Sequence, residues 1–309
     1  MISYLCAFLA AVANASSNVL NRKATQQEPA RAEFRLKLIL DLVRRRTWLI
    51  AMAITLVSFI LGATALGTGQ LAAVQILIIL ELPLTLIGGA KFLGSRLGRR
   101  DWAAISGLTG GVIGLLACLD PQSGAAPKIT PAEWIIGSAA TGGPVLVFFL
   151  LARRTRRPDR RAALLGVATG LGFGLASAYT KGMTEQFSAG GITAALASWQ
   201  LYAAGVAGIT AAWLVQNAYH AGQLAAAQPG ITLTDPAVST AWGIAVFGEQ
   251  VRGGLFFALT LIPLAAVAGS VFVLSRSPAL QATRGESPGE ASEDSQSSRD
   301  AKDKASNAR

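Results

Sequence analysis

The sequence predicts an all-α protein, a polytopic bundle of about nine transmembrane helices, and two features carry this prediction. Apolar residues make up 52% of the 309 residues and charged residues only 14%, whereas a soluble domain carries about 25% charged residues. Apolar runs of roughly 20 residues, enough to cross the hydrocarbon core as a helix, also recur along the chain. Together they exclude a disordered chain, a secreted disulfide scaffold and an ordinary soluble enzyme.

Nine apolar runs have the length of a spanning helix. In chain order they are Ile2–Leu20, Trp48–Leu66, Leu71–Leu93, Trp102–Leu119, Ala132–Ala152, Ala162–Thr180, Ile192–Gln216, Leu224–Phe247 and Gly254–Ser275. The segment 28–46, after the first run, is too charged to span. Its apolar stripe through Phe34, Leu38 and Leu42 predicts an amphipathic helix on the cytoplasmic surface. Residues 278–309 are rich in Ser, Glu, Asp and Lys, which predicts a disordered cytoplasmic tail.

The positive charges are distributed unequally between the two sides of the predicted bundle. Of the 27 Lys and Arg residues, 24 fall on one side, and three, Lys128, Lys181 and Arg252, fall on the other. Because cytoplasmic loops carry an excess of Lys and Arg, we expect the N-terminus outside and the C-terminus in the cytoplasm. The net charge of +10 is therefore a topology signal, and no nucleic acid is expected as a partner. Lys181 is interpreted as a side chain that snorkels to the membrane interface.

The expected location is a bacterial inner (plasma) membrane, because Arg outnumbers Lys and Ala is abundant, as is typical of a GC-rich genome. Ala13-Asn14-Ala15 resembles a signal-peptidase site. We nevertheless interpret the first run as a spanning helix, because no positive segment precedes it and positive charges follow it. The sequence leaves open whether the protein forms a homodimer.

A short segment occurs twice in the chain. Residues 69–75 (GQLAAVQ) and 222–228 (GQLAAAQ) are identical at six of seven positions, and at the same offset Pro83 matches Pro236. Each segment opens a predicted span, so the second to fourth spans correspond to the seventh to ninth, and the first to the sixth. The result is a 4+1+4 repeat, in which four spans are followed by one linking span and four more. The repeat is inverted, because the charge pattern gives the second copy the opposite orientation in the membrane. Convergence of two alanine-rich helices is the alternative.

The predicted units follow from this duplication. They are a first transmembrane repeat at 1–119, a linker helix with a basic cytoplasmic loop at 120–161, a second, inverted repeat at 162–277 and the tail at 278–309. Inverted repeats are the architecture by which many secondary transporters expose a central site to each side in turn.

Two pairs of motifs support a family resemblance. They are Leu80-Glu81-Leu82-Pro83 with Leu93-Gly94-Ser95-Arg96-Leu97, and Thr234-Asp235-Pro236 with Phe247-Gly248-Glu249-Gln250-Val251. Over residues 1–277 the chain resembles the drug/metabolite transporter superfamily (EamA-like proteins), whose halves carry a helix with a mid-membrane proline, a Gly-Glu turn and a glycine-rich helix. The nine spans, the long basic connection and Lys181-Gly182 are similar to its NIPA-like branch, named for magnesium transport. Ser95 departs from this pattern, because it stands where the first half of the family has its turn glutamate.

Two carboxylates fall well inside predicted spans. Glu81 is the eleventh of the 23 residues of the third span, and Asp235 is the twelfth of the 24 residues of the eighth. A charge at the bilayer centre costs about 3 kcal/mol on insertion scales, so such residues usually face a cavity or a partner. Both acids are therefore candidates for the substrate pathway.

Three prolines are expected to break the helices near these acids. Pro83 would leave the carbonyl of Ile79 without a helical partner, and Pro236 would do the same to Thr232. Pro229 would loosen the eighth span again. Broken backbone at the midplane is tolerated where it lines a polar cavity, so a carboxylate with open carbonyls predicts a site for a hard cation or an ammonium group.

Polar side chains extend three helical faces. They are Gln228, Thr232, Asp235, Ser239 and Trp242 on the eighth span, Glu81, Thr85 and Gly88 on the third, and Asn14, Ser17, Asn18 and Asn21 on the first. Spacings of three and four place each set on one side of a helix, and we expect the three faces to converge on one central pathway. The alternatives are protonated acids buried between helices and, on the first span, polar contacts that only hold helices together.

Other patterns receive structural interpretations. Glycine recurs every four residues at Gly166, Gly170 and Gly174, which predicts close helix packing. Tryptophan begins three spans, which is typical of anchors at the membrane surface; these are Trp48, Trp102 and Trp134.

We expect a secondary transporter of a small molecule, a metabolite or drug exporter in contact with bilayer lipid. Cys6, Cys118 and the single His220 form no ligand pattern, so neither a metal nor another cofactor is expected. An enzyme is not expected either, because no nucleophile motif and no pair of acids on one helix is present. The alternatives are a NIPA-like magnesium or divalent-cation transporter, which needs only one or two carboxylates, and a membrane scaffold without a substrate.

Overall fold

The computed structural model describes residues 1–25, 46–93, 97–122, 129–222 and 224–277. The predicted amphipathic helix, up to residue 45, and the predicted disordered tail lie outside the described residues, as does Ser95. Within the described ranges the chain consists of α-helices and contains no strand, and an isolated bridge pairs Gln122 with Gln250. The all-α prediction is therefore confirmed.

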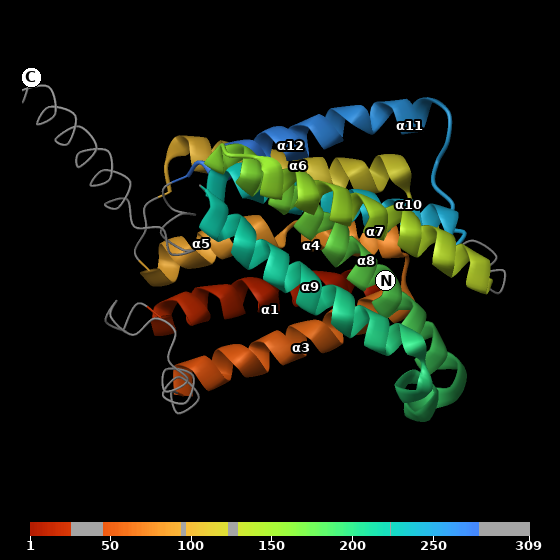
Figure 1. Ribbon diagram of the computed structural model, residues 1–309. Helices are drawn as coiled ribbons and strands as arrows, with labels where there is room; N and C mark the ends of the chain where they lie inside the picture. The colour runs from red at the N-terminus through yellow and green to blue at the C-terminus, as the bar shows by residue number, and fades with distance from the viewer. Residues whose placement is uncertain (26–45, 94–96, 123–128, 223, 278–309) are drawn as a thin grey trace, which may run out of the picture.

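The helices lie side by side in one bundle (Figure 1). Their bounds are α1 Ile2–Thr25, α3 Arg46–Thr68, α4 Leu71–Ile78, α5 Glu81–Leu93, α6 Arg99–Leu119, α7 Pro131–Arg154, α8 Pro158–Ala197, α9 Trp199–Ala221, α10 Leu224–Ala245, α11 Leu255–Leu259 and α12 Leu261–Ser275. Six stretches are long and apolar enough to cross a membrane, namely Ile2–Leu20, Leu49–Thr68, Leu71–Phe92, Arg99–Leu119, Pro131–Arg154 and Pro158–Ala197. These helices indicate a multi-pass membrane protein, and the count of nine spans stays a prediction.

Helix pairs from the two halves of the chain pack in a similar way. α1 packs along α3, and α8 packs along α9 and α10. α4 contacts α10, and α6 contacts α12, so helices from the first half of the chain meet helices from the second. In Figure 1, α3 lies at the lower edge of the bundle and α11 and α12 at the upper edge, with α4 and α5 between them.

Large apolar side chains cover the outer surface of the bundle. Phe59 on α3 and Leu146 on α7 are both 57% exposed, and Ile209 on α9 is 74% exposed. A soluble monomer rarely shows so extensive an apolar surface, whereas lipid chains are as apolar as these residues. The exposure pattern therefore agrees with the membrane assignment.

The third predicted span is interrupted at residues 79–80, between α4 and α5. Pro83 has no N–H for the carbonyl of Ile79, four residues before it. That carbonyl instead accepts the N–H of Leu82 at 3.1 Å. The predicted open carbonyl is therefore wrong, because the chain tightens into a turn and closes the bond one residue earlier. The break itself is present, and it places Glu81 at the first position of α5.

The predicted break in the eighth span is absent. α10 continues as one helix through both Pro229 and Pro236. We attribute its continuity to α8, which supports the same stretch of backbone: a Cβ atom at Gly170 would lie 2.9 Å from the carbonyl oxygen of Ile231. A closely packed neighbour keeps a helix intact where proline removes a hydrogen bond.

Glycine permits this contact along the whole seam between α8 and α10. A Cβ atom at Gly174 would lie 2.9 Å from Cβ of Val238, and one at Gly166 would overlap the carbonyl of Ala227. Any larger residue would push the helices apart, so the prediction of close helix packing is confirmed.

α8 extends beyond the predicted sixth span and takes in the start of the predicted seventh. Its backbone departs from helical geometry at Gly190 and Gly191. Gly191 has φ of 69°, a left-handed conformation that glycine adopts without strain. α9 then begins at Trp199. The predicted ninth span is similarly divided into α11 and α12, next to Thr260.

Candidate functional site

Glu81 is held by two asparagine side chains of α1. Asn14 Nδ2 donates to Glu81 Oε2 at 2.6 Å, and Asn18 Nδ2 donates to Glu81 Oε1 at 2.8 Å. Glu81 also begins α5, where the N-terminal end of the helix dipole favours a negative charge. Each carboxylate oxygen accepts from one amide, so the group is fixed in one orientation.

A cavity of about 710 Å³, called the central cavity below, opens beside this carboxylate. Its wall includes seven of the predicted residues: Asn14, Asn18, Glu81, Thr85, Gln228, Thr232 and Pro236. Gln75, Gln216 and Tyr219 add further polar groups. Among its lining residues Glu81 alone is charged, so the central cavity favours a positively charged occupant.

A second cavity of about 580 Å³ continues from the central cavity between α1, α3, α8 and α9. The two share Asn14, Gln75 and Glu81 among their lining residues. Glu81 therefore stands where the two cavities meet. Each cavity has the volume of a typical small-molecule site, about 300–1,000 Å³.

Thr85 follows Glu81 by about one helical turn and also lines the central cavity. Its side chain is fully buried, and its Oγ1 has no hydrogen-bond partner among the described residues. Leaving a buried hydroxyl unpaired costs about 1–3 kcal/mol. Because Thr85 lies on the cavity wall, a rotation of its side chain would bring the hydroxyl to a molecule that enters the cavity.

The polar face of α10 divides between two environments. Gln228 and Thr232 line the central cavity, and Gln228 Nε2 donates to Thr232 Oγ1 at 2.8 Å. Ser239 is fully buried and donates to Asp235 Oδ1 at 3.3 Å. Asp235 is not among the residues that line the cavity, although Pro236, the next residue, does line it. The structure thus brings both acids to one region and places only Glu81 on the wall.

Trp242, at the end of that face, lies in an aromatic cluster and lines neither of these two cavities. It is 3% exposed, and its Nε1 donates to Thr141 Oγ1 at 2.9 Å. Trp134 is the centre of the cluster, with ring centroids 5.6 Å from Trp242, 5.8 Å from Tyr179 and 5.9 Å from Phe247. Trp134 is itself buried. Its predicted role as a surface anchor is therefore wrong, because the neighbouring rings enclose it.

The polar face of α1 also divides. Asn14 and Asn18 point to Glu81, whereas Ser17 Oγ donates to the carbonyl oxygen of Ala51 on α3 at 2.9 Å. Asn14 and Asn18 thus line the central cavity, and Ser17 holds α1 against α3. The side chains of Asn21 and Trp48 lie outside the described residues, and Trp102 at the start of α6 is 52% exposed.

Glu249 and Lys181 form a second buried polar cluster, which the sequence reasoning missed. The Glu249 carboxylate accepts the backbone N–H groups of Leu71 and Ala72 at the start of α4, the latter at 3.1 Å. Lys181 Nζ lies 3.5 Å from Glu249 Oε1 and donates to the carbonyl oxygen of Gly69 at 2.7 Å. The cluster ties α8 and the segment after α10 to the turn between α3 and α4.

The burial of this pair corrects the interpretation of Lys181 as a snorkelling residue. Lys181 is 9% exposed and Glu249 is 5% exposed. A buried cation requires a partner of opposite charge, and Glu249 supplies it. The sequence held a signal for this pair, because Lys181 is one of three cations on the sparsely charged side and Glu249 is the turn glutamate of the second motif.

A relative of this chain occurs in Corynebacterium glutamicum, where it is an uncharacterized protein. The two are 27% identical over 256 residues, an alignment that covers 81% of this chain and 86% of the relative. No family model and no solved structure matches the chain. The function is therefore argued from the geometry of the cavities.

Proposed function

We propose that the protein is a secondary transporter that moves a small organic cation, a metabolite or drug, through the central cavity by alternating access. One observation carries this proposal. Glu81, inside a membrane bundle, is fixed by Asn14 and Asn18 on the wall of a cavity that contains no other charged residue among those that line it. A buried carboxylate on a cavity wall is costly to the fold, and a positively charged substrate would offset that cost.

The packing of the helices supports the inverted repeat that alternating access uses. The contact of α1 with α3 has its counterpart in that of α8 with α9, and α4 and α6 contact their counterparts α10 and α12. α4 and α10 also begin at Leu71 and Leu224, the same position of the duplicated segment. This pairing is what two related halves around a two-fold axis would produce. It favours the drug/metabolite transporter superfamily as the family of the chain.

The two ends of the central cavity differ. Gln216 and Tyr219, near the end of α9, extend its wall toward the basic end of the bundle, where Arg153–Arg161 lie. Toward the opposite end lie the aromatic cluster and the Lys181–Glu249 pair, none of which lines the central cavity. Alternating access requires a site that opens to one side at a time, and this asymmetry between the two ends supports the proposal.

The geometry favours an organic cation over magnesium. Both oxygens of Glu81 already accept amide hydrogen bonds, whereas Mg²⁺ demands near-octahedral oxygen ligands. An ammonium group can instead bind Glu81 and the Thr85 hydroxyl by hydrogen bonds and leave the asparagines in place.

Transport in proteoliposomes tests the proposal. We would measure counterflow of primary, tertiary and quaternary amines, with Mg²⁺ in the same panel. Glu81→Gln is expected to abolish flux, and Asp159→Asn, at the exposed start of α8, is the matched control. Flux that survives Glu81→Gln would overturn the role of the central cavity. Flux of Mg²⁺ alone would favour the NIPA-like alternative, and absence of any flux would favour a scaffold.

A further inference from the structure

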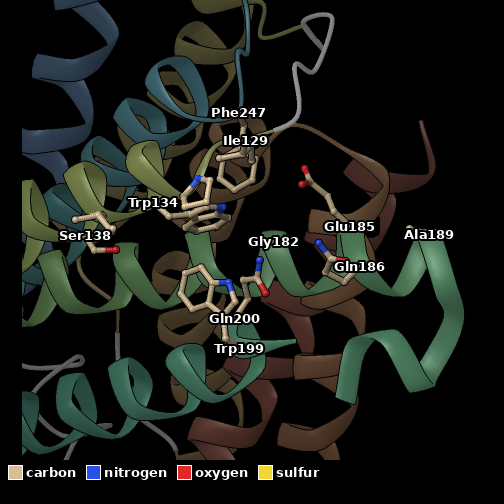
Figure 2. A pocket seen from close by; sticks show the side chains of 12 residues that line it. Ile129, Trp134, Ser138, Gly182, Glu185, Gln186, Ala189, Trp199, Gln200 and Phe247 are labelled. Carbon is tan, nitrogen blue, oxygen red and sulfur yellow. The ribbon is translucent and has the colours of Figure 1, made fainter. Parts of the chain in front are cut away.

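A third cavity lies at the end of the bundle opposite the basic end. It has a volume of about 930 Å³ and shares no lining residue with the central cavity. Figure 2 shows its wall, formed by Trp134 of α7, Glu185 of α8, Trp199 and Gln200 of α9, and Phe247 after α10. We call it the aromatic cavity, because three of its lining residues, Trp134, Trp199 and Phe247, are aromatic.

Gln200 is an unpartnered polar group on this wall. Its side chain is 7% exposed, and its amide makes no hydrogen bond among the described residues. Buried amides are normally hydrogen-bonded. Gln200 lines the cavity and lies beside Trp199 in Figure 2, so its amide is available to a ligand in the cavity.

The charges around the cavity leave one carboxylate unbalanced. Glu185 lines the cavity, and no Lys or Arg forms an ion pair with it among the described residues. Lys181 is near enough to interact with Glu185, but its ion pair is with Glu249. One cation thus faces two carboxylates, and the net charge of this group is negative.

The aromatic rings give the cavity a second means of holding a cation. The rings of Trp134 and Phe247 have centroids 5.9 Å apart, and those of Trp134 and Trp199 lie 5.2 Å apart. Gly182 makes room for this wall, since a Cβ atom there would lie 2.7 Å from Trp134 Cη2 and 3.2 Å from Gln200 Cγ. Trp199 is 49% exposed and presents its ring to the cavity, whereas Trp134 and Phe247 are buried and Lys181 Nζ already lies 5.3 Å from the Phe247 ring centroid. A ring face beside a carboxylate is the environment in which ammonium groups are recognised.

We propose that the aromatic cavity binds the ammonium group of an organic cation, with Glu185 as the counter-ion, Gln200 as a hydrogen-bond partner and the half-exposed ring of Trp199 against its alkyl groups. A metal ion does not fit, because hard cations require several oxygen ligands and this wall is mainly aromatic. The ammonium group belongs either to a free amine or to a lipid headgroup. A role for the cavity as a second station on the transport path rests on the proposed function, whereas binding itself does not.

Binding of choline to the purified full-length protein in detergent tests this proposal. The readouts are intrinsic tryptophan fluorescence and titration calorimetry, and the uncharged carbon analogue of choline, dimethylbutanol, serves as the neutral probe. We expect choline to bind at least tenfold more tightly than the neutral analogue. Glu185→Gln should weaken choline binding about tenfold, the loss expected on removal of a charge-assisted contact.

Three further arms make the result specific. Glu133→Gln is the control for charge, because it removes a carboxylate at the same end that does not line the cavity. Gly182→Ala should weaken binding by crowding Trp134. Nanodiscs with phosphatidylethanolamine, compared with nanodiscs of phosphatidylglycerol alone, identify the source: competition with choline assigns the site to a lipid headgroup, and its absence assigns it to free amines.

Equal binding of choline and the neutral analogue would overturn the proposal, as would equal affinities of the Glu185→Gln and Glu133→Gln proteins. Glu81→Gln separates this site from the central cavity. Choline binding that survives Glu81→Gln while transport is lost supports both sites. Binding at the aromatic cavity without transport by the unaltered protein would overturn the proposed function and leave this inference standing.

Discussion

Two glutamates inside the bundle, Glu81 and Glu249, have their negative charges stabilised by different kinds of partner. Glu249 accepts two backbone N–H groups at the start of α4 and pairs with Lys181. Glu81 accepts hydrogen bonds from the side-chain amides of Asn14 and Asn18 and borders two cavities. α4 separates them, since Glu249 caps its first turn and Glu81 follows its end.

The difference lies in what each partner can do. The fold fixes the partners of Glu249, which are backbone N–H groups at a helix start and a buried lysine. Glu249 therefore cannot exchange these partners without loss of structure. Amide side chains rotate, and a cavity gives room for a substituting ligand. We therefore assign Glu249 to stability and Glu81 to substrate binding, and four predictions test this division.

The largest effect is expected from Glu249→Ala. It leaves Lys181 buried without a counter-ion and α4 without its cap, a loss of about 3–5 kcal/mol in the free energy of unfolding. Thermal unfolding in detergent, followed by tryptophan fluorescence, measures it. Adding Lys181→Met should restore part of the stability, because no unpaired charge then remains. An unchanged melting temperature in the single variant would contradict the assignment.

Removing either asparagine that holds Glu81 should affect transport more than stability. Asn14→Leu and Asn18→Leu each remove one charge-assisted hydrogen bond, so we expect flux of the transported amine to fall about tenfold. Asn217→Leu is the control, because Asn217 lines neither the central nor the second cavity and donates to the carbonyl oxygen of Trp213. Loss of stability in proportion to the loss of flux would show that the asparagines serve packing instead.

A smaller effect is expected from Thr85→Val. The substitution keeps the shape of the side chain and removes the unpaired hydroxyl, so stability should be unchanged or slightly higher. Because a neutral hydrogen bond contributes about 0.5–1.5 kcal/mol, the KM for the transported amine should rise about two- to tenfold. An unaltered KM would remove Thr85 from the substrate site.

The smallest effect is expected from Ser17→Ala. Ser17 bonds to α3 and does not line the central cavity. We expect a loss of about 1 kcal/mol in stability and the same KM as the unaltered protein. A changed KM here would mean that the polar face of α1 acts as one unit, against the division between its residues.

The sequence predicted the helical class and the approach of Asn14, Asn18 and Glu81, because both follow from local periodicity. Spacings of three and four decide which residues share a helix face, and a carboxylate in a span restricts what can lie beside it. The same pattern could not separate Ser17 from Asn18, since adjacent positions on one face meet different neighbours once three helices surround it.

Features that depend on distant partners were not predictable in the same way. The Lys181–Glu249 pair joins residues far apart in the chain, and the signals at the two positions, a cation on the sparsely charged side and a turn glutamate, do not indicate that they meet. The continuity of α10 through Pro229 and Pro236 likewise depends on α8, a helix that the proline rule does not consider. The boundary between the predicted sixth and seventh spans also differs from the prediction. The backbone leaves helical geometry at Gly190 and Gly191, and not at the polar residues before them.

The glycine seam between α8 and α10 has a mechanical consequence. Where two helices touch backbone to backbone, there are no flexible side chains between them that could adjust to a sliding or tilting motion. We therefore expect this pair to move as a single rigid unit. In the proposed mechanism, α1 and α3 would then move to switch the site between outward and inward exposure. The side-chain hydrogen bonds of the asparagines and the serine on α1 can break and form again during this movement. The half of the bundle that carries Asn14 and Asn18 would be the moving part, and the glycine-rich half its fixed frame.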